Sequence, residues 1–117
     1  MKDKLKKFYQ DGGKEYYGKL IHIYIPAEVF MKDPEIIKGK KGNVLLLFKN
    51  KSVPILVSPA NLYYKRIKRK LARKNHRIKT VSVYGKIIRP TWDTNGKCHL
   101  QVFKMKTFGG SLMKNVG

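Results

Sequence analysis

Only one stretch of the sequence, residues 58–74, combines a helix start signal with apolar side chains at helical spacing. Ser58 offers a hydroxyl for the N-cap and Pro59 fits the first turn, while Asn75 marks the expected end. The apolar face of this helix comprises Ala60, Tyr63, Tyr64, Ile67 and Leu71. The other patterned segments are short or alternate with a period of two, so we expect a mostly β chain with a single helix.

Five segments have the pattern of β-strands. Three precede the helix, at 16–25, 44–48 and 53–57, and two follow it, at 81–87 and 98–105. Pro54 has no amide hydrogen to donate, so the strand at 53–57 is expected to lie at a sheet edge or to begin with a bulge. Residues 31–41 contain Asp33-Pro34 and Gly39, which favour a loop.

The order strand, strand, strand, helix, strand, strand resembles the OB-fold, a five-stranded Greek-key β-barrel. The likeness covers residues 16–108 and includes Gly18, near the first strand. It implies an all-β domain with one helix (β-β-β-α-β-β), between a flexible N-terminal segment at 1–15 and a C-terminal tail at 109–117.

The resemblance also implies where a ligand binds. OB-folds commonly bind oligonucleotides or oligosaccharides on the face of their second and third strands and in two flanking loops. In this sequence those loops correspond to residues 31–42 and 89–97.

The charge of the chain is strongly one-sided. Its 117 residues include 27 Lys and Arg against 7 Asp and Glu, which gives a formal net charge of +20. No acidic residue occurs between Glu35 and Asp93, whereas sixteen lysines and arginines do. Such a distribution produces one large positive field, which favours a polyanionic ligand over a neutral sugar.

The helix at 58–74 concentrates this charge. Four pairs of like charges stand four residues apart on it: Lys65–Arg69, Arg69–Arg73, Arg66–Lys70 and Lys70–Lys74. Each such pair costs about 0.2–0.5 kcal/mol, so together they cost roughly 1–2 kcal/mol. Bound phosphates would offset this repulsion; the alternative is a solvated face that salt screens.

Aromatic rings beside basic residues are candidates for stacking on unpaired bases, at about 1–3 kcal/mol per base. Phe48, Tyr84 and Trp92 fit this description, with core packing as the alternative for Phe48 and the capping of a barrel end for Trp92. The expected nucleic-acid contacts are Lys40, Lys41, Phe48, Lys49, Lys65, Arg66, Lys68, Arg69, Arg73, Arg77, Tyr84, Lys86, Arg89 and Trp92.

The sequence offers little material for catalysis or metal binding. The single cysteine excludes an intramolecular disulfide framework, and His22, His76 and His99 share no metal-ligand spacing. Neither a nucleophile elbow nor a GK[ST] phosphate loop is present. We therefore expect no enzyme activity, no cofactor and no metal.

These observations favour a basic nucleic-acid-binding protein that contacts single-stranded DNA or RNA through phosphate electrostatics and stacking. One alternative is a ribosome-associated or structured-RNA-binding protein inside a larger protein or ribonucleoprotein assembly. Another is a cationic module that binds acidic proteins or anionic lipid. No 18-residue apolar stretch predicts a transmembrane segment, and the basic N-terminus lacks the apolar region of a signal peptide, so we expect a cytoplasmic protein.

Overall fold

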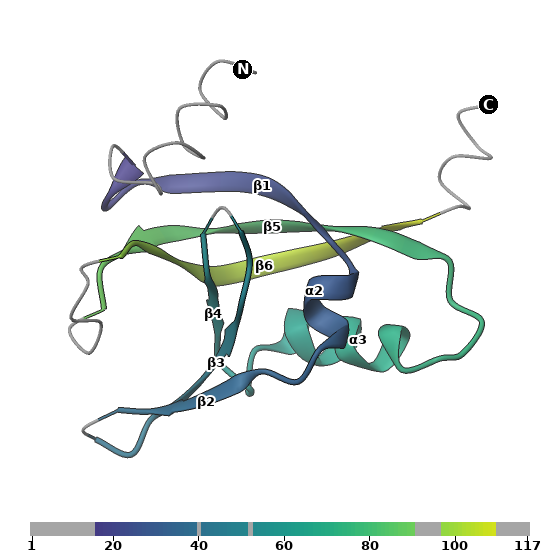
Figure 1. Ribbon diagram of the computed structural model, residues 1–117, viewed down its shortest axis with the longest axis horizontal. Coiled ribbons are helices and arrows are strands. Elements are labelled where there is room, and N and C mark those ends of the chain that lie inside the picture. Colours follow the sequence, from purple (N-terminus) through teal and green to yellow (C-terminus); the bar gives the residue numbers. More distant parts are fainter. Residues whose placement is uncertain (1–15, 40, 52, 91–96, 110–117) are drawn as a thin grey trace.

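The computed structural model describes residues 16–39, 41–51, 53–90 and 97–109. The predicted segment at 1–15 and, beyond residue 109, the predicted tail lie outside these residues. The strands are β1 (Leu20–Pro26), β2 (Glu35–Lys38), β3 (Val44–Phe48), β4 (Ile55–Val57), β5 (Ile78–Ile88) and β6 (His99–Gly109). The helices are α2 (Glu28–Met31) and α3 (Leu62–Leu71). All six strands form one sheet in the order β1-β5-β6-β4-β3-β2, and the two helices lie beside one another, as Figure 1 shows.

The predicted β-rich character is confirmed, and the sheet has one strand more than the five predicted. The segment expected to be a loop, 31–41, contains β2, which pairs antiparallel with β3 from Glu35 to Lys38. Gly42 adopts a φ of 80° in the connection between these strands, a conformation that glycine adopts without strain. The additional strand makes a six-stranded sheet in which β1 and β2, consecutive in the chain, lie at opposite ends.

The segment at 53–57 was expected to lie at a sheet edge or to begin with a bulge, and the edge position is wrong. The strand β4 lies between β3, with which it pairs antiparallel, and β6, with which it pairs in parallel. Pro54 precedes the strand instead of lying within it, so no ladder hydrogen bond is lost. The Pro54 carbonyl still joins the sheet by accepting a hydrogen bond from the Leu100 amide at 2.9 Å.

Helix α3 begins three residues later than Ser58-Pro59 predicted. Asn61 is the N-cap, and its Oδ1 accepts a hydrogen bond from the Tyr64 amide at 3.1 Å. Ser58 belongs to the preceding turn, where its carbonyl accepts from the Asn61 amide at 3.0 Å. The face expected to be apolar buries Tyr64, Ile67 and Leu71, whereas Tyr63 remains 40% exposed.

The hydrophobic core lies between α3 and the inner face of the sheet. Residues that alternate along the long strands supply part of it: Ile23, Ile25, Val81, Val83, Ile87, Leu100, Val102 and Met105. Phe48, expected to stack on a base, is only 2% exposed. Its ring packs against Phe30 at 5.1 Å and Tyr64 at 5.8 Å between centroids, so that prediction is wrong. Burial in this core raises the pKa of the Tyr64 phenol.

A β-bulge in β6 determines which of its side chains face outward. Tyr84 pairs with Lys104, but the next residue, Gly85, pairs with Val102, so Phe103 is one extra residue in β6. A Cβ atom at Gly85 would lie 2.0 Å from the Gln101 carbonyl oxygen, and only glycine fits there. Because a bulge shifts the alternation by one, Val102 and Met105 both face the core.

Candidate nucleic-acid interface

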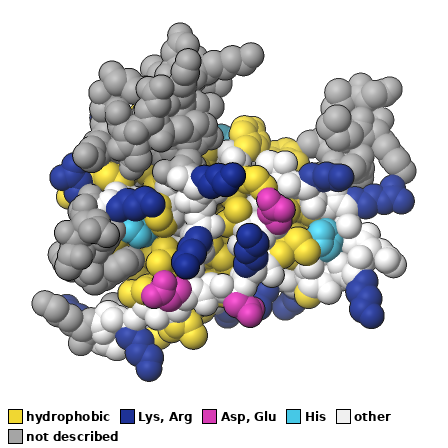
Figure 2. Space-filling view, in the orientation of Figure 1, with side chains coloured by type: hydrophobic (Ala, Val, Ile, Leu, Met, Phe, Trp, Pro, Cys, Tyr) yellow, Lys and Arg dark blue, Asp and Glu magenta, His cyan; other side chains and the backbone are white. Residues whose placement is uncertain are grey.

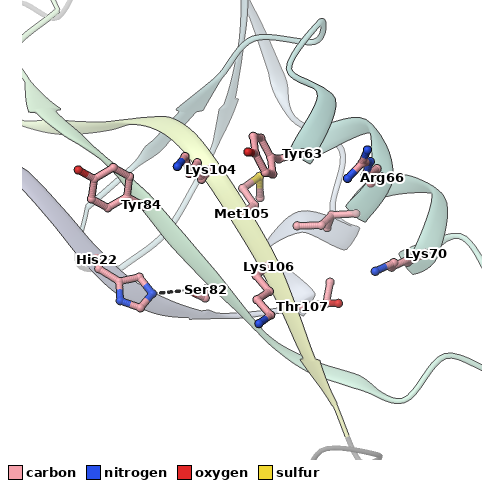
Figure 3. Close-up of a pocket in the computed structure, with 11 residues that line it drawn as sticks. His22, Tyr63, Arg66, Lys70, Ser82, Tyr84, Lys104, Met105, Lys106 and Thr107 are labelled. Carbon is pink, nitrogen blue, oxygen red and sulfur yellow. Dashed lines mark hydrogen bonds between the residues drawn. The ribbon is translucent and has the colours of Figure 1, made fainter.

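A groove of about 380 Å³ lies between α3 and the sheet and crosses β6 (Figure 3). We call it the β6 groove. Four elements line it: β1 with His22, β5 with Ser82 and Tyr84, β6 with Lys104, Met105, Lys106 and Thr107, and α3 with Tyr63, Arg66, Ile67 and Lys70.

Four cationic side chains converge on the β6 groove. Arg66 and Lys70 stand four residues apart, which places them on one face of α3. Lys104 and Lys106 stand two residues apart, which places them on one face of β6. No carboxylate is among the described residues that line this groove. The fold therefore holds like charges from two separate elements next to one another.

The carboxylates of the described residues lie outside the β6 groove, and all of them belong to the segment 28–35. They belong to Glu28, Asp33 and Glu35, and in Figure 2 the acidic side chains lie over α2 and β2. Three other grooves on the described surface each include at least one of these carboxylates among their lining residues. The β6 groove differs from them in having cations alone.

Aromatic side chains flank the cations from both sides. Tyr63 lines the groove from α3, and Tyr84 lines it from β5 (Figure 3). His22 hydrogen-bonds through Nε2 to the Ser82 hydroxyl, which links β1 to β5 inside the groove. Ser82 is 8% exposed whereas His22 is exposed, so the bond joins a buried hydroxyl to an imidazole on the surface of the groove.

The aromatic surface continues beyond the groove along the outer face of β1 and β6. Tyr24 lies 5.1 Å from the His22 ring and 5.8 Å from the Phe108 ring between centroids. The Lys106 ammonium lies 5.7 Å from the centre of the Phe108 ring. Rings and cations thus alternate on this face, as in surfaces that stack bases and bind phosphates.

The structure brings only two of the predicted contact residues, Arg66 and Tyr84, into the β6 groove. Exposed cations that lie outside it are Lys41, Lys49, Lys65, Lys68, Arg69, Arg73, Arg77, Lys86 and Arg89. Lys49 and Lys68 line grooves that contain carboxylates, and Arg89 lies 4.9 Å from the centre of the Tyr17 ring. Lys40 and Trp92 lie outside the described residues.

The groove also includes residues that the sequence reasoning missed. Lys104 and Lys106 stand two residues apart in the last strand, so the alternation of a β-strand predicts that both side chains lie on one face. Tyr63 was assigned to the packing face of the helix, but it lies at the margin of that face and is 40% exposed. His22 and Ser82 lie 60 residues apart, and only the pairing of β1 with β5 brings them together.

The groove also differs in place from the surface that the OB-fold resemblance implied. That surface comprises the second and third predicted strands, now β3 and β4, with loops at 31–42 and 89–97. The β6 groove involves β1, β5, β6 and α3 instead. Residues 91–96, which form most of the second loop, lie outside the described residues.

Among the described residues, no group of three or more His, Cys, Asp or Glu side chains is placed to hold a metal ion. Neither described helix is long and apolar enough to cross a membrane.

Comparisons with known proteins give a loose structural likeness. No protein-family model matches the chain, and no curated protein matches it. The crystal structure of asparaginyl-tRNA synthetase from Pyrococcus horikoshii is similar with a TM-score of 0.46 and 17% identity, over 81% of this chain and 21% of the synthetase chain. Its complex with asparaginyl-adenylate gives a TM-score of 0.45 and 18% identity, over 81% and 20%. The chain therefore spans about a fifth of the length of these structures.

Proposed function

We propose that this chain binds nucleic acid and that its β6 groove holds a single-stranded segment of DNA or RNA. The observation that carries the proposal is the convergence of Arg66, Lys70, Lys104 and Lys106 on one groove, whose described lining residues include no carboxylate. Phosphates would offset the repulsion among these cations. The proposal is one of binding without catalysis. It retains an OB-like character, since β3, β4, α3, β5 and β6 follow one another in the expected order.

The groove supplies both contributions that single-strand binding requires. Four phosphate contacts would give a slope of about −2.8 for the logarithm of the binding constant against the logarithm of salt concentration, at about 0.7 per contact. Stacking on Tyr63 or Tyr84 would add about 1–3 kcal/mol per base. The groove volume of about 380 Å³ is enough for a short unpaired segment.

A matched pair of charge-reversal variants tests the proposal. The groove variant is Arg66→Glu with Lys104→Glu, and the control is Lys38→Glu with Lys51→Glu, two exposed lysines outside the β6 groove. Both variants lower the net charge equally, so they affect the overall field alike. Fluorescence anisotropy with a labelled single-stranded oligonucleotide at several salt concentrations measures both affinity and slope.

We expect the groove variant to lose the contacts to two phosphates, which reduces the steepness of the salt dependence by about 1.4. The control should keep the wild-type slope. Equal losses of affinity and of salt dependence in the two variants would show that only the net charge matters, and the assignment to the groove would be wrong. A wild-type protein that binds no nucleic acid at about 50 mM salt would overturn the proposed function itself.

A further inference from the structure

The strand β6 has one free edge inside the groove. It pairs with β5 along its whole length, but β4 reaches only Leu100 and Gln101 on its other side. Beyond Gln101, no described strand pairs with this second edge, which faces α3. The side-chain amide of Asn61, at the N-cap of α3, donates to the Phe103 carbonyl at 3.1 Å, which shows that this carbonyl points toward the helix.

The register identifies which backbone groups point to the free edge. Along a strand, side chains alternate between the two faces while the N–H and C=O groups alternate between the two edges, so residues on one face share one edge. Leu100 faces the core, and its amide donates toward β4, to Pro54. Met105 and Thr107 pair with the buried residues Val83 and Val81, which places them on the same inner face.

The N–H and C=O groups of Met105 and Thr107 therefore point away from β5 and toward α3. The one-residue bulge at Phe103 does not change which edge belongs to which face. It shifts the alternation of the side chains and the alternation of the backbone groups by the same one residue. Both residues line the β6 groove, between the four cations and the two tyrosines already described. The groove thus presents backbone donors and acceptors side by side. Figure 3 shows the Tyr63 and Tyr84 rings on either side of β6.

We propose that the free backbone edge at Met105 and Thr107 hydrogen-bonds the Watson–Crick edge of an unpaired base. This inference rests on the proposed function and specifies its ligand as a nucleotide whose pairing edge is free. Each nucleobase carries adjacent hydrogen-bonding groups on that edge, which a strand edge complements and which a duplex already uses.

A strand edge is also a docking site for extended peptides. The groove favours the nucleotide because its cations match phosphates and because Tyr63 and Tyr84 offer flat surfaces for a base. An acidic peptide would use the cations but has no need of the rings.

The first experiment leaves the protein unaltered. It compares the affinity for an oligouridine with that for an oligo(3-methyluridine) of equal length, because the methyl group removes the pairing-edge donor but leaves the phosphates. We expect the methylated oligomer to bind about tenfold more weakly. Equal, salt-dependent affinities would overturn the base-edge inference and leave the proposed function standing, whereas no binding of either oligomer would overturn both.

The second experiment alters one backbone group. Thr107→Pro removes the amide that points to the free edge, and Thr107→Val is its matched control, because it changes the side chain but keeps the amide. Proline is tolerated at a strand edge where no ladder bond is lost, so the variant should fold. The lost amide is a donor whose partner would be a uracil carbonyl oxygen, so we expect Thr107→Pro to bind oligouridine about tenfold more weakly than Thr107→Val does, with an unchanged salt slope. Equal affinities of the two folded variants would overturn the base-edge inference.

An unfolded Thr107→Pro beside a folded Thr107→Val would show that this amide bonds to β5, and the edge assignment would be wrong. An alternating glutamate–valine peptide tests the other ligand. Displacement of the oligouridine by this peptide, together with equal affinity for the two oligomers, would assign the edge to a peptide and overturn the inference.

Discussion

The substitution Gly85→Ala tests the bulge that orients β6. The added Cβ would lie 2.0 Å from the Gln101 carbonyl oxygen and 2.8 Å from its carbonyl carbon, so backbone atoms must move by more than an ångström. Overpacking of this kind costs about 1–3 kcal/mol. Separating β5 from β6 at this point would also weaken two ladder hydrogen bonds, at about 0.5–1.5 kcal/mol each. We therefore expect a loss of about 2–6 kcal/mol in the free energy of unfolding.

Thermal and urea unfolding followed by circular dichroism measure this loss. A domain of about this size loses roughly 4–8 °C of Tm per kcal/mol, so the Tm should fall by at least about 8 °C. The control is Gly39→Ala, where the nearest atom to the added Cβ is the Asn43 carbonyl oxygen at 3.4 Å, an ordinary contact. A Gly85→Ala protein that melts within about 2 °C of wild type would refute the reasoning that the bulge requires glycine.

Two further predictions concern the core beneath α3. Phe48→Ala should cost about 3–5 kcal/mol in urea unfolding, because the ring is buried between Phe30 and Tyr64, and a cost below about 1 kcal/mol would contradict that packing. Burial raises the pKa of Tyr64, so as pH rises above about 10 the unfolded state loses this proton first and stability falls. Tyr64→Phe should therefore show a shallower fall in Tm than wild type at alkaline pH, and parallel curves would exclude the effect.

Local sequence signals predicted most of the regular elements. The period of two predicted β1, β5 and β6, and the helical spacing of Tyr64, Ile67 and Leu71 predicted the buried face of α3. The strand β2 was missed because only four residues, between Pro34 and Gly39, form it. Its stability comes from pairing with β3, which a local reading cannot include.

The candidate site was less predictable than the elements. Arg66 and Tyr84 were both predicted to contact nucleic acid, but no spacing along the chain relates them to one groove. Lys104 and Lys106 received no role in the sequence reasoning, although their alternation with Met105 is visible. Phe48 was given a binding role because a lysine follows it, but its burial depends on Phe30 and Tyr64, which lie far away in the chain.

The sequence by itself determined the charge, the β-rich character and the basic helix, because composition and short-range periodicity depend only on neighbouring residues. Tertiary structure decided where the cations meet, since the groove exists only when α3 lies against β6. It also decided which edge of β6 stays free, because that depends on how far β4 extends. Contacts between residues distant in the chain arise from packing and strand register, and neither can be predicted from any single position of the sequence.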